Sequence, residues 1–291
     1  MILRPYQAKV IDDLWDWFHK HGDGNPIVNA VVGAGKSVLI ASLAKKAMSE
    51  YPGTRILVIV HQKELLQQNL EKLTAVWPEA PVGIHSASVG KKDLHHDIIY
   101  ATIGSIYKKA HEIGKVDLIL ADECHLINSK ESGIWRQFIA DVKKYNPYCR
   151  TIGWTGTPFR GDGVWLTAGD EPLFHGVAAK VTMRDLINAA CSGLEKHVDA
   201  DAILAETVKN LYDGVPIDEV YKSAILAARA MVENDPAYSK VTARLLLHTI
   251  RKEVLSEEAS QEDMNTRYAT YFPKFIKRGV EAGLLNSELS R

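Results

Sequence analysis

The sequence predicts an α/β fold: a parallel β-sheet with helices on both faces over residues 1–185, followed by an all-helical segment over residues 186–291. Three observations predict it. In the first segment, short apolar runs alternate with stretches of helical spacing, the pattern of repeated strand–helix units. In the second segment, no strand pattern exceeds the helical pattern. Composition changes at the same boundary, because sixteen of the twenty glycines and all six tryptophans lie before residue 186.

The composition is that of a globular protein. A length of 291 residues fits about two domains. Hydrophobic residues make up 46% and charged residues 24%, which excludes a disordered or collagen-like chain. The net charge of −1 gives no overall basic field, so nucleic-acid contacts must come from a local patch. The three cysteines form no C-x-x-C pair, and no apolar run is long enough for a membrane span. We expect a cytoplasmic protein with reduced cysteines, no signal peptide and no membrane contact.

Five strands are expected in the first segment, each a short apolar run. The run at residues 55–60 is apolar on both faces, as strands inside a parallel sheet are. Helices are expected where apolar residues recur every three to four positions, as Leu66, Leu70 and Leu73 do. The expected strands are 26–30, 55–60, 98–100, 116–121 and 151–155, and the expected helices are 36–49, 63–76 and 133–142.

The second segment is expected to hold four helices. Asp235 followed by Pro236 is a typical helix start, because aspartate caps a helix and proline suits its first position. The helix that begins there is expected to run through residue 254. A last helix is expected at 268–282, with a break at Pro273. The other two are expected at 199–212 and 216–233.

A glycine-rich turn connects the first expected strand to the next helix. Glycines let backbone amides surround a phosphate, and the helix N-terminus adds partial positive charge. Lys36 would reach the β- and γ-phosphates of a nucleotide, and the Ser37 hydroxyl would bind Mg²⁺. The alternative is a plain glycine-rich turn with a surface lysine. The residues match the phosphate-loop pattern, with Ala in the first glycine position: Ala30-Val31-Val32-Gly33-Ala34-Gly35-Lys36-Ser37.

Two carboxylates follow the apolar strand that ends near residue 121. Asp122 would hold Mg²⁺ through water, and Glu123 would orient and deprotonate the attacking water. The alternative is a solvated acidic turn. Cys124 and His125 come next, but no second Cys/His pair suggests a metal site. We interpret Cys124 as a small tolerated residue and His125 as a hydrogen-bonding coupler.

These residues resemble a known family. The acidic D-E-C-H box at residues 122–125 resembles the D-E-x-H box of superfamily 2 helicases and translocases. Leu3-Arg4-Pro5-Tyr6-Gln7 resembles the adenine-sensing motif of that family, although a plain surface position remains the alternative for Gln7. The resemblance spans residues 1–185 and implies a RecA-like lobe. Within the family, this segment most resembles the branch of restriction motors and repair translocases. It implies ATP and Mg²⁺ as cofactors, with nucleotide contacts from Arg4, Gln7, Gly33, Ala34, Gly35, Lys36 and Ser37.

Two further segments resemble the motifs with which this family contacts nucleic acid. They are Val60-His61-Gln62-Lys63-Glu64-Leu65-Leu66 and Ala101-Thr102-Ile103-Gly104-Ser105. The resemblance implies binding through His61, Gln62, Thr102 and Ser105. Thr102 and Ser105 as helix caps remain an alternative. Lys91-Lys92 with His95-His96 is interpreted as a solvated charged loop rather than a nucleic-acid patch.

Residues 153–160 resemble the motif that couples hydrolysis to strand movement, with Gly156 where the family usually has alanine. The resemblance implies coupling through Thr155 and Thr157 together with His125, and turn residues are the alternative for the two threonines. The implied function is the ATP-binding and hydrolysing motor lobe of a DNA or RNA helicase or translocase, with DNA favoured. Nothing after residue 185 resembles the second RecA-like lobe, whose arginine finger is worth about 10³–10⁵ in rate. We therefore expect weak hydrolysis, or a second lobe or subunit that acts in trans.

From about residue 186 the chain resembles another family, the large (α) chain of class I ribonucleotide reductase. No reductase site residue is carried over, because Cys191 does not fit that family's catalytic cysteine pattern. We interpret the chain as a chimera joined near residues 182–190. The alternatives are a helicase with a helical accessory domain, a truncated reductase fragment without catalytic cysteines, and a module whose helices bind a partner. The matching segments are 198–204, 210–216 and 235–247.

Overall fold

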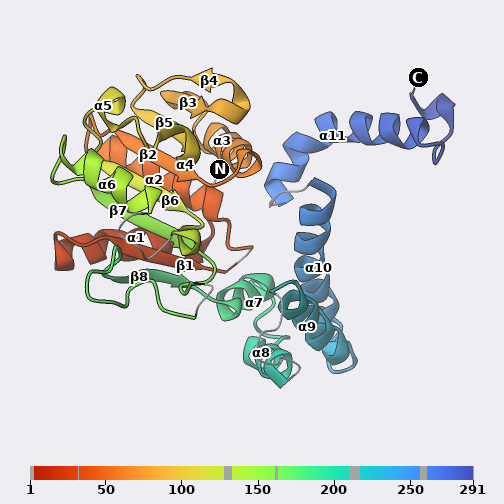
Figure 1. Ribbon diagram of the computed structural model, residues 1–291. Helices are drawn as coiled ribbons and strands as arrows, with labels where there is room; N and C mark the ends of the chain where they lie inside the picture. Colours follow the sequence, from red (N-terminus) through yellow and green to blue (C-terminus); the bar gives the residue numbers. More distant parts are fainter. Residues whose placement is uncertain are drawn as a thin grey trace. The chain divides into compact units, whose positions relative to one another are not determined.

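The computed structural model describes residues 3–31, 33–127, 133–160, 163–209, 217–255 and 261–290. The chain forms two compact units, Met1–Ser192 and Gly193–Arg291 (Figure 1). Helix α7 (Met183–Cys191) belongs to the first unit. The division therefore falls after residue 192 rather than after residue 185.

The first unit is built on one eight-stranded sheet in the order β4-β3-β5-β2-β6-β7-β1-β8. All neighbouring strands are parallel except β4, which runs antiparallel to β3 at one edge. The predicted α/β fold with a parallel sheet is confirmed. The strands are β1 (Pro26–Ala30), β2 (Ile56–Val60), β3 (Val82–Ser86), β4 (Lys91–Lys92), β5 (Ile98–Thr102), β6 (Leu118–Asp122), β7 (Arg150–Thr155) and β8 (Gly176–Val181).

All five expected strands are present, and three more were missed. The missed strand β3 reads Val-Gly-Ile-His-Ser, so its sequence lacks an apolar run. Strand β4 is only Lys91–Lys92, and β8 combines small residues with the exposed Val177 at the sheet edge. Strands β5 and β6 end later than predicted, because the parallel pairing continues through Thr102 and Asp122.

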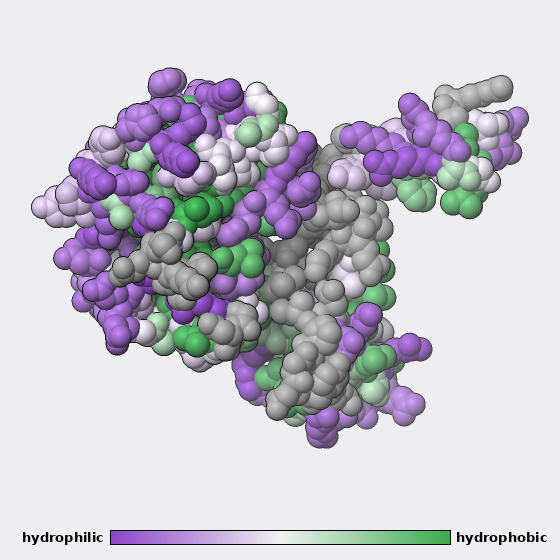
Figure 2. All heavy atoms as spheres, in the orientation of Figure 1, coloured by the Kyte–Doolittle hydropathy of each residue, from purple (hydrophilic) through white to green (hydrophobic). Residues whose placement is uncertain are grey.

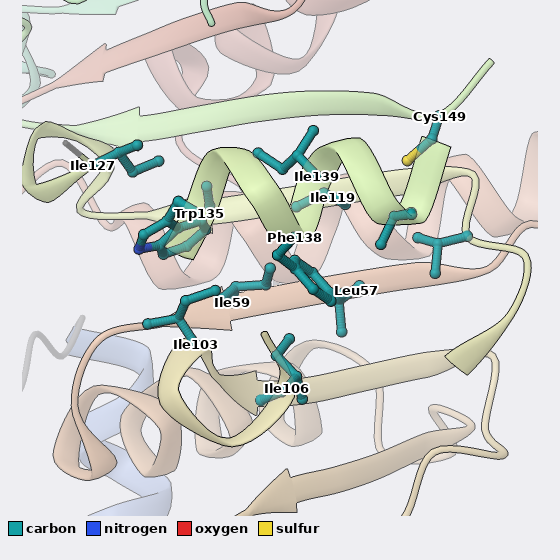
Figure 3. Packing of buried hydrophobic residues seen from close by; sticks show 14 of the residues in the cluster. Leu57, Ile59, Ile103, Ile106, Ile119, Ile127, Trp135, Phe138, Ile139 and Cys149 are labelled. Carbon is teal, nitrogen blue, oxygen red and sulfur yellow. The ribbon is translucent and has the colours of Figure 1, made fainter. Parts of the chain in front are cut away.

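Helices cover both faces of this sheet, as expected. Phe138 and Ile139 of helix α6 pack on Leu57 and Ile119 from the central strands (Figure 3). On the opposite face, Asn69 of helix α3 reaches Asp122 at the end of β6. The helices of this unit are α1 (Pro5–His21), α2 (Lys36–Glu50), α3 (Lys63–Val76), α4 (Ile103–Ile106), α5 (Ala110–Ile113), α6 (Ile134–Lys143) and α7, with 3-10 turns at Ala87–Val89 and Cys124–Leu126.

In the part of the second unit that the structure describes, every element is helical, which confirms the all-helical segment. The elements are α8 (Ala200–Lys209), α9 (Ile217–Ala230), α10 (Ala237–Leu255) and α11 (Gln261–Glu281), with 3-10 turns at Met231–Glu233 and Ser287–Ser290. Asp235 caps α10, because its Oδ1 accepts a hydrogen bond from the Ala237 amide at 2.7 Å. The predicted segment 210–216 lies outside the described residues.

The predicted break at Pro273 is wrong. Helix α11 runs from Gln261 to Glu281 with Pro273 inside it. Proline inside a helix removes one backbone donor and can kink the helix without ending it. None of the described helices is both long and apolar enough to cross a membrane.

The second unit has a small core and a partly apolar surface. Ile203, Ala224 and Val241 of α8, α9 and α10 are buried. Figure 2 shows hydrophobic residues at the surface of this unit. The exposed apolar side chains include Val208, Leu226, Leu246, Leu247, Ile250, Phe272 and Phe275.

Candidate functional site

The predicted site residues follow strands that end at one edge of the sheet. Strands β1, β2, β5, β6 and β7 are parallel, so their carboxyl ends lie on the same side. This is the edge where ligands bind in open α/β sheets. Strand β7 pairs with both β1 and β6, and its last residue, Thr155, lies opposite Asn29 of β1. The loop after β1 and the acidic pair after β6 therefore flank Thr155.

The glycine-rich turn has the backbone that the phosphate-loop pattern requires. Gly33 and Gly35 have φ values of 90° and 79°, in the left-handed region that favours glycine. Gly35 is the residue before α2, so Lys36 and Ser37 are the first two residues of that helix. A Cβ atom at Gly35 would lie 2.6 Å from Gln7 Nε2. Residue 32 of the loop lies outside the described residues.

Gln7 connects helix α1 to this loop. Its Nε2 donates a hydrogen bond to the Ala34 carbonyl at 3.0 Å, and its Oε1 accepts one from the Arg4 amide at 3.0 Å. Gln7 is only 7% exposed, so the alternative of a surface position is wrong. Arg4 Nη1 donates to the Tyr6 hydroxyl at 3.2 Å. Sequence reasoning placed Gln7 beside the nucleotide, and the structure adds its contact with the loop backbone.

The loop and the acidic pair meet. Lys36 Nζ lies 2.5 Å from Glu123 Oε1, and both side chains are mostly buried. Glu123 has a φ of 49°, and among the described residues it is the one non-glycine residue with positive φ. Such backbone strain is concentrated at functional sites. A surface lysine and a solvated acidic turn are both excluded, because Asp122 is 4% exposed and Lys36 contacts Glu123.

The two carboxylates have different electrostatic surroundings. Burial alone would raise the pKa of Glu123, but the hydrogen bond from His125 and the Lys36 ammonium lower it to about 2. Burial raises the pKa of Asp122, and the nearby Lys36 ammonium opposes that shift. Glu123 is therefore ionised at neutral pH. In this arrangement its charge is paired with Lys36.

Asp122 is held by two hydrogen-bond donors. Asn69 Nδ2 donates to Asp122 Oδ2 at 2.8 Å, and the Glu123 amide donates to Asp122 Oδ1 at 3.0 Å. Sequence reasoning missed Asn69. The available signal was a polar residue on the buried face of α3, three residues after Leu66 and four before Leu73, both of which are buried.

His125 links the acidic pair to the end of β7. His125 Nδ1 lies 2.9 Å from Thr155 Oγ1 and 3.3 Å from Glu123 Oε2. Thr155 is fully buried. Its hydroxyl donates to the Thr157 carbonyl at 2.9 Å and accepts from the Thr157 amide at 3.0 Å. The three residues expected to couple hydrolysis to movement therefore form one hydrogen-bonded group, to which Thr157 contributes its backbone.

Two of the expected nucleic-acid contacts follow β2. The His61 ring packs on Trp135, with ring centroids 5.2 Å apart, and its Nε2 is buried. Burial, with a smaller effect of His125, lowers the pKa of His61. Gln62 is exposed at the start of α3. Of this pair, Gln62 has the side chain that is open to solvent.

The other two expected contacts follow β5. Thr102 Oγ1 lies 2.9 Å from Ser105 Oγ and donates to Ser86 Oγ at 3.3 Å. Thr102 precedes α4 but makes no side-chain capping bond, so the capping alternative is wrong for it. Ser105 Oγ accepts from the Ala87 amide at 3.0 Å. Lys91 and Lys92 are exposed on the antiparallel edge strand β4.

The residues present fit a magnesium–nucleotide complex better than a metal held by protein alone. No group of three His, Cys, Asp or Glu side chains within the described ranges could hold an ion. Magnesium in such sites takes few protein ligands and is otherwise held by phosphate and water. The fit is supported by a buried carboxylate at Asp122 and by the buried Oδ1 of Asn69, which has no hydrogen-bond partner among the described residues. Cys124 is buried, and burial raises its thiol pKa, so it remains a neutral packing residue.

Comparison with known proteins gives similarities of two kinds. The α subunit of the ribonucleoside-diphosphate reductase of Chlamydia muridarum is 36% identical over 100 residues, 34% of this chain and 10% of that protein. The ATP-dependent helicase IRC3 of Saccharomyces cerevisiae is 28% identical over 300 aligned positions, 95% of this chain and 42% of that protein. The chain therefore spans less than half the length of either relative. The second similarity extends beyond residue 192 into the helical unit.

Two solved structures are also similar. The UvsW helicase of bacteriophage T4 has a TM-score of 0.46 at 17% identity, covering 62% of this chain and 61% of that one. The type ISP restriction–modification enzyme LlaGI, solved with a DNA substrate mimic, has a TM-score of 0.47 at 13% identity, covering 95% and 33%.

The family assignment comes from the first unit. Residues 1–160, more than half of the chain, match the family described as "Type III restriction enzyme, res subunit". These residues contain the glycine-rich loop, the acidic pair and the Thr155 group. The chain belongs to this restriction-enzyme family, and its first unit has an α/β fold built on an eight-stranded sheet.

Proposed function

We propose that the first unit binds ATP with Mg²⁺ and hydrolyses it as the motor lobe of a nucleic-acid translocase. The contact between Lys36 and Glu123 carries this proposal. It brings the phosphate-binding loop and the proposed general base together from opposite sides of strand β7. Family membership of residues 1–160 supports the same chemistry.

In this proposal, different residues bind the phosphates, the magnesium ion and the attacking water. The amides of Gly33, Ala34 and Gly35 bind the phosphates, and Lys36 contacts the β- and γ-phosphates. Ser37 and Asp122 hold the magnesium ion, which supplies charge neutralisation at the phosphates. Glu123 orients the attacking water and accepts its proton. Because Lys36 is paired with Glu123 in this arrangement, its movement to the phosphates would free the carboxylate to act as a base.

Adenine recognition is assigned to Arg4 and Gln7. Gln7 Oε1 accepts one hydrogen bond, from the Arg4 amide, and an amide oxygen has two lone pairs. The second lone pair can accept the exocyclic amine of adenine while Nε2 remains bonded to Ala34. Adenine binding would therefore act on the phosphate loop through the hydrogen bond from Gln7 to Ala34.

The nucleic-acid contacts are assigned to His61, Gln62, Thr102 and Ser105, on the same sheet edge as the nucleotide. We favour DNA over RNA, because the matched family is named for restriction enzymes. His125 with Thr155 and Thr157 would transmit hydrolysis to this edge. The arginine finger would come from a second RecA-like lobe, and hydrolysis by this chain alone would be slow. The cytoplasmic location stays a prediction from the cysteine pattern.

The test is ATP hydrolysis by the full chain with and without single-stranded DNA, double-stranded DNA and RNA. Glu123→Gln should remove hydrolysis and its stimulation by nucleic acid while ATP still binds. The matched control is Glu112→Gln, because Glu112 also pairs with a lysine, Lys109 at 2.8 Å, but at an exposed position. Equal hydrolysis by wild type and Glu123→Gln would contradict the proposal.

A second candidate function is a protein-binding module in the helical unit. Its support is the exposed apolar surface, with Leu246 and Ile250 one turn apart on α10. Such exposed apolar side chains are typical of binding surfaces. Sedimentation at increasing protein concentration would test it: self-association that disappears in a Leu246→Ser/Ile250→Ser variant supports the module. A monomer at all concentrations would contradict self-association.

A further inference from the structure

Strand β6 has an aspartate–asparagine pair at each end. Asn146 Nδ2 donates to Asp117 Oδ1 at 2.9 Å just before the strand begins. Asn69 Nδ2 donates to Asp122 Oδ2 at 2.8 Å where the strand ends. The two pairs join the same chemical groups at opposite ends of the strand, but Asp117 is partly exposed whereas Asp122 is buried.

The two asparagines differ in their remaining hydrogen bonds. Asn146 also donates to the Val116 carbonyl, and its Oδ1 accepts from the Tyr148 amide, so its amide group is satisfied by the surrounding structure. Asn69 is 1% exposed, and its Oδ1 has no hydrogen-bond partner among the described residues. A buried amide oxygen without a donor is destabilising.

The hydrogen bond from Asn69 determines the orientation of the Asp122 carboxylate. Each Asp122 oxygen accepts one donor, from Asn69 on one side and from the Glu123 amide on the other. A carboxylate has about four lone-pair positions, so one remains on each oxygen. The plane of the group is fixed, and the remaining lone pairs have fixed directions. Asn69 is on α3 rather than on the loop or on β6, so this restraint comes from outside the expected motifs.

We propose that Asn69 is a positioning residue for Asp122, which it holds in the orientation that binds the magnesium ion of the nucleotide complex. This inference rests on the proposed function. Residues that hydrogen-bond to a metal-binding carboxylate orient it, and their loss typically costs 10–100-fold in metal affinity or activity. Asn69 does not touch the nucleotide itself. Its removal should therefore change the magnesium requirement and spare magnesium-free nucleotide binding.

The substitution Asn69→Leu separates this role from a structural one. Leucine keeps the branched shape of the side chain, removes the donor to Asp122 and removes the unpaired Oδ1. If Asn69 were only structural, this change would leave metal binding unaltered. Asn69→Ser is the second variant, because serine is too short to reach Asp122 but retains a polar group. The matched control is Asn146→Leu, which breaks the equivalent pair at the other end of β6.

The experiment measures binding of a fluorescent ATP analogue by the full chain, in EDTA and at increasing Mg²⁺. In Asn69→Leu and Asn69→Ser, the Mg²⁺ concentration that gives half of the magnesium-dependent binding should rise by about tenfold, with binding in EDTA unchanged. Asn146→Leu should lower the melting temperature and leave the Mg²⁺ requirement unchanged. An unaltered requirement in a folded Asn69 variant would overturn the inference while the proposed function stands. If the wild-type chain binds no nucleotide, the proposed function and this inference both fail.

Discussion

Lys36 Nζ lies 2.5 Å from Glu123 Oε1, although the two residues are 87 positions apart in the sequence. Lys36 is the first residue of helix α2, and Glu123 follows strand β6. Both groups are largely shielded from solvent. This ion pair has two consequences for the site. It stabilises the site without a nucleotide, and it pairs the two groups that would act on the terminal phosphate. A nucleotide would have to separate them to react.

Lys36→Ala should weaken binding of ATP with Mg²⁺ by at least about tenfold, because the phosphates lose a direct cationic contact. The measurement is a nucleotide titration followed by fluorescence. Lys46→Ala is the matched control, since Lys46 is on the same helix and pairs with Glu50 at 2.7 Å in a solvent-exposed position. Unchanged affinity in Lys36→Ala would count against the assignment of the phosphate loop.

Gly35→Ala should disrupt the phosphate loop. The φ of 79° at this position disfavours alanine by about 1–2 kcal/mol, and the added Cβ would lie 2.6 Å from Gln7 Nε2. The control is Gly53→Ala, which has a similar φ of 85° but open space around the added atom. We expect Gly35→Ala to lower the free energy of unfolding more than Gly53→Ala does, and to weaken nucleotide binding as well. Equal losses in denaturant unfolding would mean that the Gln7 contact is unimportant.

Protonation of Glu123 in acid should lower the free energy of unfolding. Its pKa is about 2 in the folded chain and ordinarily 4.5, so folding favours its ionised form. The contribution, at most about 3 kcal/mol, is fully present above the ordinary pKa and is lost as the pH falls towards the folded value. Asp122 acts in the opposite direction, because burial raises its pKa and ionisation then costs stability.

Glu123→Gln should therefore flatten the loss of stability between the ordinary and the folded pKa of Glu123. Urea unfolding at a series of pH values measures this. Glu112→Gln serves again as the exposed control and should retain the wild-type slope. If the free energy of unfolding falls as steeply with decreasing pH in Glu123→Gln as in the wild type, other carboxylates dominate acid unfolding.

Thr155→Val should uncouple hydrolysis from nucleic acid and leave ATP affinity unchanged. The substitution removes the hydroxyl that contacts His125 and the Thr157 backbone. Thr151→Val is a control in the same strand. The Thr151 hydroxyl is buried and has no hydrogen-bond partner in the described part of the chain, so its removal should be neutral or stabilising. The ratio of DNA-stimulated to basal hydrolysis measures the effect. A normal ratio in Thr155→Val would argue against the coupling role.

Strong local signals in the sequence were sufficient to predict several elements. An apolar run followed by glycines, a lysine and a helical period identified β1, the loop and α2. An apolar run that ends in two carboxylates identified β6 and its acidic pair. Such signals lie within a few residues of one another, so periodicity and turn chemistry are enough to find them.

Contacts between side chains from distant segments could not be predicted in this way. Asn69 and Asp122 are 53 residues apart, and no local pattern says that α3 places its buried polar residue at the end of β6. The same holds for the burial of the His61 ring against Trp135. Strands β3, β4 and β8 were missed because their residues are weakly apolar, and pairing with neighbouring strands stabilises them rather than their own propensity. Contacts between distant segments depend on how sheets and helices pack. A local sequence pattern does not contain that information.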